Sequence, residues 1–261
     1  MIAVYIDSDL QRFNKKIRYT CNFLFKTLGY EFKFISRIDQ LLDNDILFFY
    51  GLLEPSAKEA YILAMNKIMF FIPVETDLLE PGKFSLQDVK NYTREIKLIQ
   101  KIPIISKNEI KVPLQFSKQK DLFYGVFKFD LIGNLFFSLS SYDELKCEKK
   151  DKHNRVPDTE ISFLKFQFTP YVNIFLWFAD NCIGDAISEM DNYFLMKKEY
   201  WPGAESLAVS FSHNIDKLRK WNFKSMIKSS FEDIFMIYKI KYFVNNLISR
   251  LKYILTNIED Y

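Results

Sequence analysis

Short apolar runs alternate with stretches of helical spacing over the first 75 residues. Between residues 10 and 28, apolar side chains recur at about every third or fourth position, which predicts a helix, and Gly29 follows as its C-terminal cap. Pro55 and Ser56 open a second predicted helix over residues 57–67. The apolar runs predict strands at residues 2–6, 32–35, 45–51 and 68–74. This order of elements predicts a small, mostly parallel α/β sheet covered by helices.

The middle of the chain is less regular. Residues 73–90 have the composition of a loop, and strand-like pieces are expected at 95–105 and 109–116. From Tyr124 to Leu145 the apolar spacing turns helical. A polar loop over 147–160 separates this stretch from a second apolar helix, expected at 169–190. We therefore expect an N-terminal α/β module at 1–120 and a mainly helical continuation of it at 121–200.

A third part, residues 201–261, begins with a short alternating segment. Residues 206–212 alternate in the manner of a strand, and residues 222–257 have the spacing of one or two helices. Directly after the strand stand His213, Asn214 and Asp216. Barrel and open-sheet enzymes hold their catalytic residues at the carboxyl ends of strands, so these three are the candidate site.

Histidine is scarce in this sequence. Only His153 and His213 occur among 261 residues, which excludes a metal site with three histidines. His153 lies in a charged loop, where contact with solvent or a carboxylate explains it better than metal ligation. The three cysteines, Cys21, Cys147 and Cys182, are far apart and form no CxxC pair, which is typical of reduced thiols in the cytoplasm.

The net charge of +3 does not favour a nucleic-acid partner. The charge is uneven, because residues 217–261 contain nine Lys or Arg against four Asp or Glu. Such a basic tail can contact phosphates or an anionic membrane surface, but a helix with a solvated basic face has the same composition. No apolar stretch reaches the roughly 18–20 residues of a membrane span, and the start lacks the basic region of a secretion signal. We expect a cytoplasmic protein without a transmembrane segment.

Nucleotide binding is the familiar function of a parallel α/β layer. Here the first strand is followed by Asp7-Ser8-Asp9-Leu10, which has no glycine where a phosphate would approach the backbone. The sequence contains no GxGxxG or GKS/T motif. Asp7 and Asp9 are better explained as caps of the first helix, so nucleotide binding is disfavoured.

Several segments, taken in order, resemble a branch of the polysaccharide deacetylase-like proteins. Trp201-Pro202, the run 207–216 and Lys220-Trp221 resemble the opening of the catalytic domain, where a strand ends in Thr-His-Asp-Val-Asp. The upstream segments 12–30, 136–144 and 151–157 resemble the uncharacterised N-terminal module that precedes this domain. The resemblance spans nearly the whole chain.

The resemblance implies metal-dependent hydrolysis of N-acetyl groups on sugars, on a distorted (β/α) barrel. In that family a divalent metal, often zinc, is held by one aspartate and two histidines spaced H-x-x-x-H, and lowers the pKa of its bound water to about 7. A second aspartate takes a proton from this water. Carried over to this chain, Asp216 matches the metal ligand, Asn214 stands at the base position and His213 lies beside it.

The chain departs from that pattern at two points. The amide of Asn214 is not basic enough to take a proton, and no histidine follows His213 up to Tyr261. His213 and Asp216 are then either remnants of a metal site or a strand-end cap with a hydrogen-bonded polar pair. We expect the chain to bind no zinc and to release no acetate, either as a fragment of a longer protein or as a shortened homologue.

Two function hypotheses follow. The chain is either the N-terminal portion of a deacetylase-like protein acting on polysaccharide or lipid-linked sugar, or a non-catalytic carbohydrate-pathway binding or assembly module. Trp201 and Trp221 either stack on a sugar or pack against the strand between them. The first strand of an incomplete (β/α) barrel-like domain leaves an unpaired edge, so we expect a covering helix or a homodimer.

Overall fold

The computed structural model of this chain describes residues 1–55, 68–80, 92–97, 101–119, 122–141, 144, 147, 149–157, 168–190 and 193–199, with residues 245, 248 and 252. The chain divides into two compact units, Met1–Ser206 and Leu207–Tyr261. The fold below is that of the first unit. The helix expected at 57–67, the strand expected at 206–212 and all but three residues of the helical segment 222–257 lie outside the described residues.

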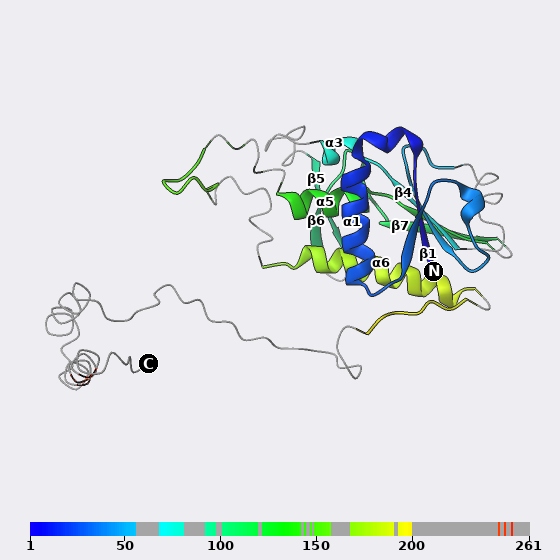
Figure 1. Cartoon of the computed structure of the whole chain (residues 1–261). Helices are drawn as coiled ribbons and strands as arrows, with labels where there is room; N and C mark the ends of the chain where they lie inside the picture. Colours follow the sequence, from blue (N-terminus) through cyan, green and yellow to red (C-terminus); the bar gives the residue numbers. More distant parts are fainter. Residues whose placement is uncertain are drawn as a thin grey trace. The chain divides into compact units, whose positions relative to one another are not determined.

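A six-stranded sheet forms the centre of the first unit (Figure 1). Its strands lie in the order β2-β1-β3-β4-β8-β7. Neighbouring strands are parallel from β2 to β8, and β7 alone runs antiparallel to its neighbour β8. The bounds are β1 Ile2–Ile6, β2 Phe32–Ile35, β3 Ile46–Gly51, β4 Ile68–Pro73, β7 Leu114–Gln119 and β8 Leu122–Phe127. The expected mostly parallel α/β sheet, with its four N-terminal strands, is confirmed.

Three helices pack on one face of this sheet (Figure 1). They are α1 Asn14–Thr27, α5 Leu131–Ser140 and α6 Tyr171–Ser188. Phe25 of α1, Leu135 of α5 and Phe175 of α6 are buried in one cluster with Phe48 and Phe70 of the sheet. The opposite face buries a second cluster that includes Leu47 and Met69. Burial on both faces explains why the central strands are continuously apolar in sequence.

The expected first helix divides into two parts. A 3-10 turn, η1 Ser8–Phe13, precedes α1, and the Asp7 side chain accepts a hydrogen bond from the Asp9 backbone N at 3.2 Å. The expected capping role of Asp7 is confirmed. Gly29 ends the helical segment with φ 79°, a left-handed conformation that glycine adopts without strain, so its expected role is also confirmed. The helix expected at 169–190 is confirmed as α6, and no helix among the described residues is long and apolar enough to cross a membrane.

A separate antiparallel hairpin lies beside α5 and α6 and consists of β5 Thr93–Lys97 and β6 Lys101–Ile105. Ile96, Ile102 and Ile104 of this hairpin join the same core as the three helices. The short helix α3, Thr76–Leu79, packs against α5. The strand-like segment expected at 95–105 is thus a hairpin, whereas only the end of the segment expected at 109–116 belongs to a strand, β7.

The helix expected from Tyr124 onward is wrong in its first part. Residues Leu122–Phe127 form β8, which lies between β4 and β7 and is buried at all six positions. A strand buried on both faces loses the alternation that marks a strand, so its apolar run cannot be told from a buried helix by periodicity. The helix α5 begins at Leu131 and ends at Ser140, where Ser141 takes a left-handed conformation with φ 49°.

Two glycines, one in β8 and one in α6, differ in the space that an added Cβ atom would find. A Cβ added at Gly125 of β8 would lie 2.7 Å from the ring of Phe70, so Gly125→Ala is expected to lower the free energy of unfolding by about 1–3 kcal/mol. Gly184, on the exposed side of α6, has no atom within 4 Å of such a Cβ. Gly184→Ala should raise the free energy of unfolding by about 0.5–1 kcal/mol. Urea unfolding followed by circular dichroism measures both, and a neutral Gly125→Ala would contradict the packing described.

Candidate functional site

The carboxyl ends of the parallel strands surround one buried carboxylate, Asp130. Tyr50 stands near the end of β3, Glu75 follows β4 and Asp130 follows β8. Asp130 is fully buried, and the Tyr50 hydroxyl and the Glu75 backbone N approach it from parts of the chain far apart in the sequence. Parallel strands end at the same edge of a sheet, so the fold brings these three positions together.

Three donors hold the Asp130 carboxylate. The Tyr50 hydroxyl donates to it, at 2.9 Å from Oδ1 and 3.0 Å from Oδ2. The backbone N of Glu75 donates to Oδ2 at 2.8 Å, and that of Gly133 donates to Oδ1 at 2.6 Å, which makes Asp130 the N-cap of α5. Burial raises the pKa of Asp130 to about 7 in spite of these donors. Burial also raises the pKa of Tyr50, so its hydroxyl stays protonated and continues to donate.

The same edge carries a second set of contacts, which attach the hairpin β5–β6. Asn134 of α5 accepts a hydrogen bond from the Ile105 backbone N at 2.7 Å and donates to the Ile105 carbonyl at 3.0 Å. It also donates to the Asp130 carbonyl at 2.8 Å. The backbone N of Lys107 donates to Glu75 at 3.3 Å, while the Lys107 ammonium pairs with Asp77. The carboxylates of Asp130, Glu75 and Asp77 are therefore all engaged by donors of the protein itself.

The described residues contain no cluster of three His, Cys, Asp or Glu side chains that could hold a metal ion. His153 is exposed in a turn, where its backbone N donates to Asp151 at 2.8 Å and Arg155 also bonds to Asp151. The candidate residues His213, Asn214 and Asp216, with Trp201 and Trp221, lie outside the described residues. His153 therefore belongs to neither of the sites described here.

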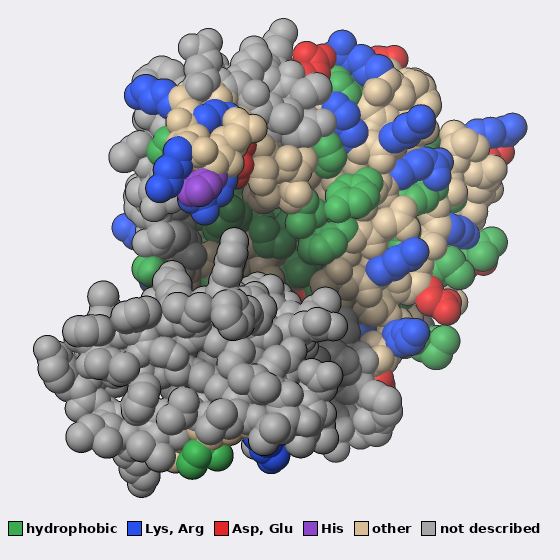
Figure 2. Space-filling model, turned by 60° about the vertical axis from the view of Figure 1, so that its left-hand side comes forward, with side chains coloured by type: hydrophobic (Ala, Val, Ile, Leu, Met, Phe, Trp, Pro, Cys, Tyr) green, Lys and Arg blue, Asp and Glu red, His purple; other side chains and the backbone are tan. Residues whose placement is uncertain are grey.

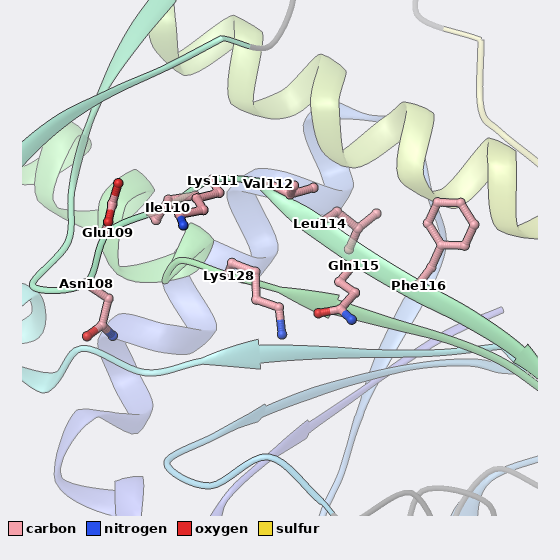
Figure 3. A pocket seen from close by; sticks show the side chains of 9 residues that line it. All are labelled: Asn108, Glu109, Ile110, Lys111, Val112, Leu114, Gln115, Phe116 and Lys128. Carbon is pink, nitrogen blue, oxygen red and sulfur yellow. The ribbon is translucent and has the colours of Figure 1, made fainter.

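A pocket of about 700 Å³ opens beside the antiparallel edge of the sheet (Figure 3). The loop before β7, the first half of β7 and the residue after β8 line it. In Figure 3, Asn108 and Glu109 lie at one end of the pocket and Phe116 at the other, with Gln115 and Lys128 between them. The lining residues are Asn108, Glu109, Ile110, Lys111, Val112, Leu114, Gln115, Phe116 and Lys128.

The pocket lies along the edge strand β7, with Phe116 on one face of the strand and Gln115 and Lys128 on the other (Figure 3). Phe116 is 63% exposed and stacks on Phe123 of β8, with ring centroids 5.6 Å apart and ring planes at 17°. The backbone N of Lys128 donates to the Pro113 carbonyl at 2.9 Å, which joins the two sides of the pocket. Figure 2 shows Lys and Arg side chains spread over the described part of one face, beside a group of hydrophobic side chains.

Sequence patterns missed both the Asp130 cluster and this pocket. One signal for Asp130 was present, because Asp130 stands directly before the apolar helical run of α5, as an N-cap does. The partners Tyr50 and Glu75 stand 80 and 55 residues away, and no local pattern connects them to Asp130.

Comparison with known proteins identifies one family. Residues 5–186 match the model of a family described as "Family of unknown function (DUF7033)". No curated protein and no solved structure matches the chain. The match covers most of the α/β unit, and the family description names no activity.

Proposed function

We propose that this chain, which belongs to the DUF7033 family of unknown function, is the N-terminal portion of a polysaccharide deacetylase-like protein whose α/β unit binds carbohydrate without cleaving it. The proposal rests on two observations. Residues 201–221 resemble the start of a deacetylase domain, and a pocket lies beside β7. The pocket carries the binding part of the proposal. The family match ends at residue 186, before the deacetylase-like residues begin, which supports two parts of different function.

The lining of the pocket suits a sugar. The C–H-rich face of a sugar ring packs on an aromatic ring, and one face of Phe116 is supported from behind by Phe123. Asn108 and Gln115 supply amides, which both donate to and accept from hydroxyl and acetamido groups. The lining combines polar side chains with the apolar Ile110, Val112, Leu114 and Phe116, and the volume of the pocket lies in the range of small-molecule sites.

The edge where α/β enzymes hold their catalytic residues has a structural role here. Asp130 accepts hydrogen bonds from Tyr50 and from two backbone N–H groups, and its carboxylate is closed off from solvent. A carboxylate held in this way joins strands and a helix, and is not placed to take a proton from a substrate. This supports a binding function for the α/β unit.

In the proposed parent protein, metal-dependent hydrolysis belongs to the segment that begins at residue 201. There Asp216 stands at the metal-ligand position of the family, but Asn214 replaces the base. Asn214 cannot accept a proton at neutral pH, so this chain is expected to bind its sugar unchanged.

The proposal predicts that the purified chain binds tetra-N-acetylchitotetraose, measured by isothermal titration calorimetry. Phe116→Ala is expected to weaken this binding about tenfold, equivalent to about 1.4 kcal/mol, because the supported ring is lost. Phe168→Ala is the matched control: Phe168 is 91% exposed and does not line the pocket, so its loss should leave the affinity unchanged. No acetate should appear in the same mixtures. Equal loss in both variants would contradict a site at Phe116, and acetate release would contradict binding without cleavage.

A further inference from the structure

Resting on the proposed function, we propose that the pocket beside β7 selects a saccharide that carries an anionic group, a carboxylate or a phosphate, held by Lys128 and Lys111. The observation behind it is a half-buried lysine that lines the pocket and has no partner among the described residues. Lys128 is half-buried and Lys111 is exposed, and both line the pocket. Over the ranges that the structure describes, neither ammonium has a hydrogen bond or an ion pair.

The other half-buried lysines of the described ranges, Lys16 and Lys33, each have a partner, and the Lys16 ammonium donates to the Leu79 carbonyl. The half-buried Lys33 pairs with the buried Asp45 at 2.6 Å, and Lys197 pairs with Asp180 at 2.7 Å. On β7 itself, Lys118 lies 3.5 Å from Glu189. A lysine ammonium at the wall of a pocket forms a charge-assisted hydrogen bond with an anionic group that reaches it. An anionic ligand would supply such a group to Lys128.

The backbone at Lys128 is held by the pairing of β8 with β7. Lys128 directly follows β8, and the last residue of β8, Phe127, pairs with Leu114 of β7. The bond from the Lys128 backbone N to Pro113 fixes the strand end against the loop that carries Lys111. In Figure 3 the side chains of Lys128 and Gln115 point to the same side. An acceptor between them would meet an ammonium and an amide together.

Two carboxylates stand near this ammonium in sequence or in space. Glu109 lines the pocket, but Figure 3 places it at the end opposite Phe116, beyond Lys111. Asp130 follows Lys128 by two residues, but it is fully buried and bonded to Tyr50, Glu75 and Gly133. Neither forms an ion pair with Lys128 in the described structure. The part of the pocket at Lys128 and Gln115 therefore keeps its positive charge for a ligand.

The test compares three probes on the full chain by isothermal titration calorimetry at low ionic strength. They are neutral tetra-N-acetylchitotetraose, tetragalacturonate as the carboxylate probe, and N-acetylglucosamine 1-phosphate as the phosphate probe, with inorganic phosphate alongside. At least one anionic sugar is expected to bind about tenfold more tightly than the neutral probe. Raising the salt concentration to about 0.15 M should reduce this difference, because the Debye length falls to about 8 Å.

Two lysine variants test which residue produces the preference for anionic sugars. Lys128→Gln keeps a long polar side chain without the charge and should remove the preference, so that the anionic and neutral probes bind with similar affinity. Lys118→Gln is the matched control. Lys118 lies on β7, which pairs with β8, but it does not line the pocket, so this variant should keep the preference for the anionic sugar. A preference that survives Lys128→Gln would overturn the assignment to Lys128.

The outcomes separate this inference from the proposed function. Equal binding of neutral and anionic sugars overturns the anionic preference and leaves carbohydrate binding intact. Failure of every sugar to bind overturns both. Inorganic phosphate binding as tightly as the sugar phosphate overturns carbohydrate recognition and points to an anion site alone. Tight binding of tetragalacturonate or of the sugar phosphate, lost in Lys128→Gln, supports the inference and shows which anionic group is selected.

Discussion

Replacing Asp130 with alanine is expected to lower the free energy of unfolding by about 3–5 kcal/mol. The change leaves the Tyr50 hydroxyl and the backbone N–H groups of Glu75 and Gly133 without their acceptor, in or near the buried end of the sheet. Each buried donor left unpaired costs about 1–3 kcal/mol, and the N-cap of α5 is lost as well. Urea unfolding followed by circular dichroism measures the loss.

Asp7→Ala is the matched control for this change. It removes another aspartate that caps a helical segment, but this one accepts a single bond, from the Asp9 backbone N, near the surface. We expect a loss of about 1 kcal/mol or less. Similar losses in Asp7→Ala and Asp130→Ala would show that the Asp130 network contributes no more than an exposed cap.

The same carboxylate makes stability depend on pH. Because the pKa of Asp130 is raised from 3.8 to about 7 in the folded protein, the folded state binds more protons than the unfolded state between these values. Its contribution to stability is therefore complete below about pH 4 and decreases as the pH rises through about 7. In Asp130→Asn this group no longer titrates. The difference in unfolding free energy between the natural chain and Asp130→Asn should fall between pH 5 and 7.5, and a constant difference would contradict the raised pKa.

Asn134→Ala is expected to lower the free energy of unfolding by about 2–4 kcal/mol. Ile105 is fully buried, and its backbone N and O both bond to the Asn134 amide. Without that amide, both backbone groups stay buried and unpaired, and the attachment of β6 to α5 weakens. Urea unfolding measures the loss, and hydrogen exchange at the Ile105 N–H should accelerate by a larger factor than exchange in the central sheet.

Asn181→Ala provides the comparison for Asn134. The Asn181 side chain donates to the Trp177 carbonyl within α6 at an exposed position, where water can replace the bond. Its removal should change the free energy of unfolding by about 0.5 kcal/mol or less. Unchanged exchange at Ile105 in Asn134→Ala would mean that the hairpin is attached by its apolar contacts alone.

The elements that sequence patterns located are those whose signals are local. The runs at β1 to β4 each have a polar residue next to at least one end, Gly29 marks the end of the first helical segment, and Pro170 stands directly before α6. The same local reading failed at β8, because all of its six residues are buried and its apolar run has no period. The alternation that distinguishes a strand depends on one face meeting water, and only the packed sheet shows that neither face does.

The sequence by itself determined the α/β class, the four N-terminal strands of a mostly parallel sheet and the absence of a phosphate-binding glycine loop after β1. Its resemblance to polysaccharide deacetylase-like proteins, through residues such as Asn214 and Asp216, stays a prediction. The tertiary structure alone decided that Asp130 meets Tyr50 and Glu75, and that Lys128 and Phe116 line one pocket. Secondary structure follows from neighbours along the chain, whereas a site is assembled from strand ends and loops whose proximity depends on pairing across the whole sheet.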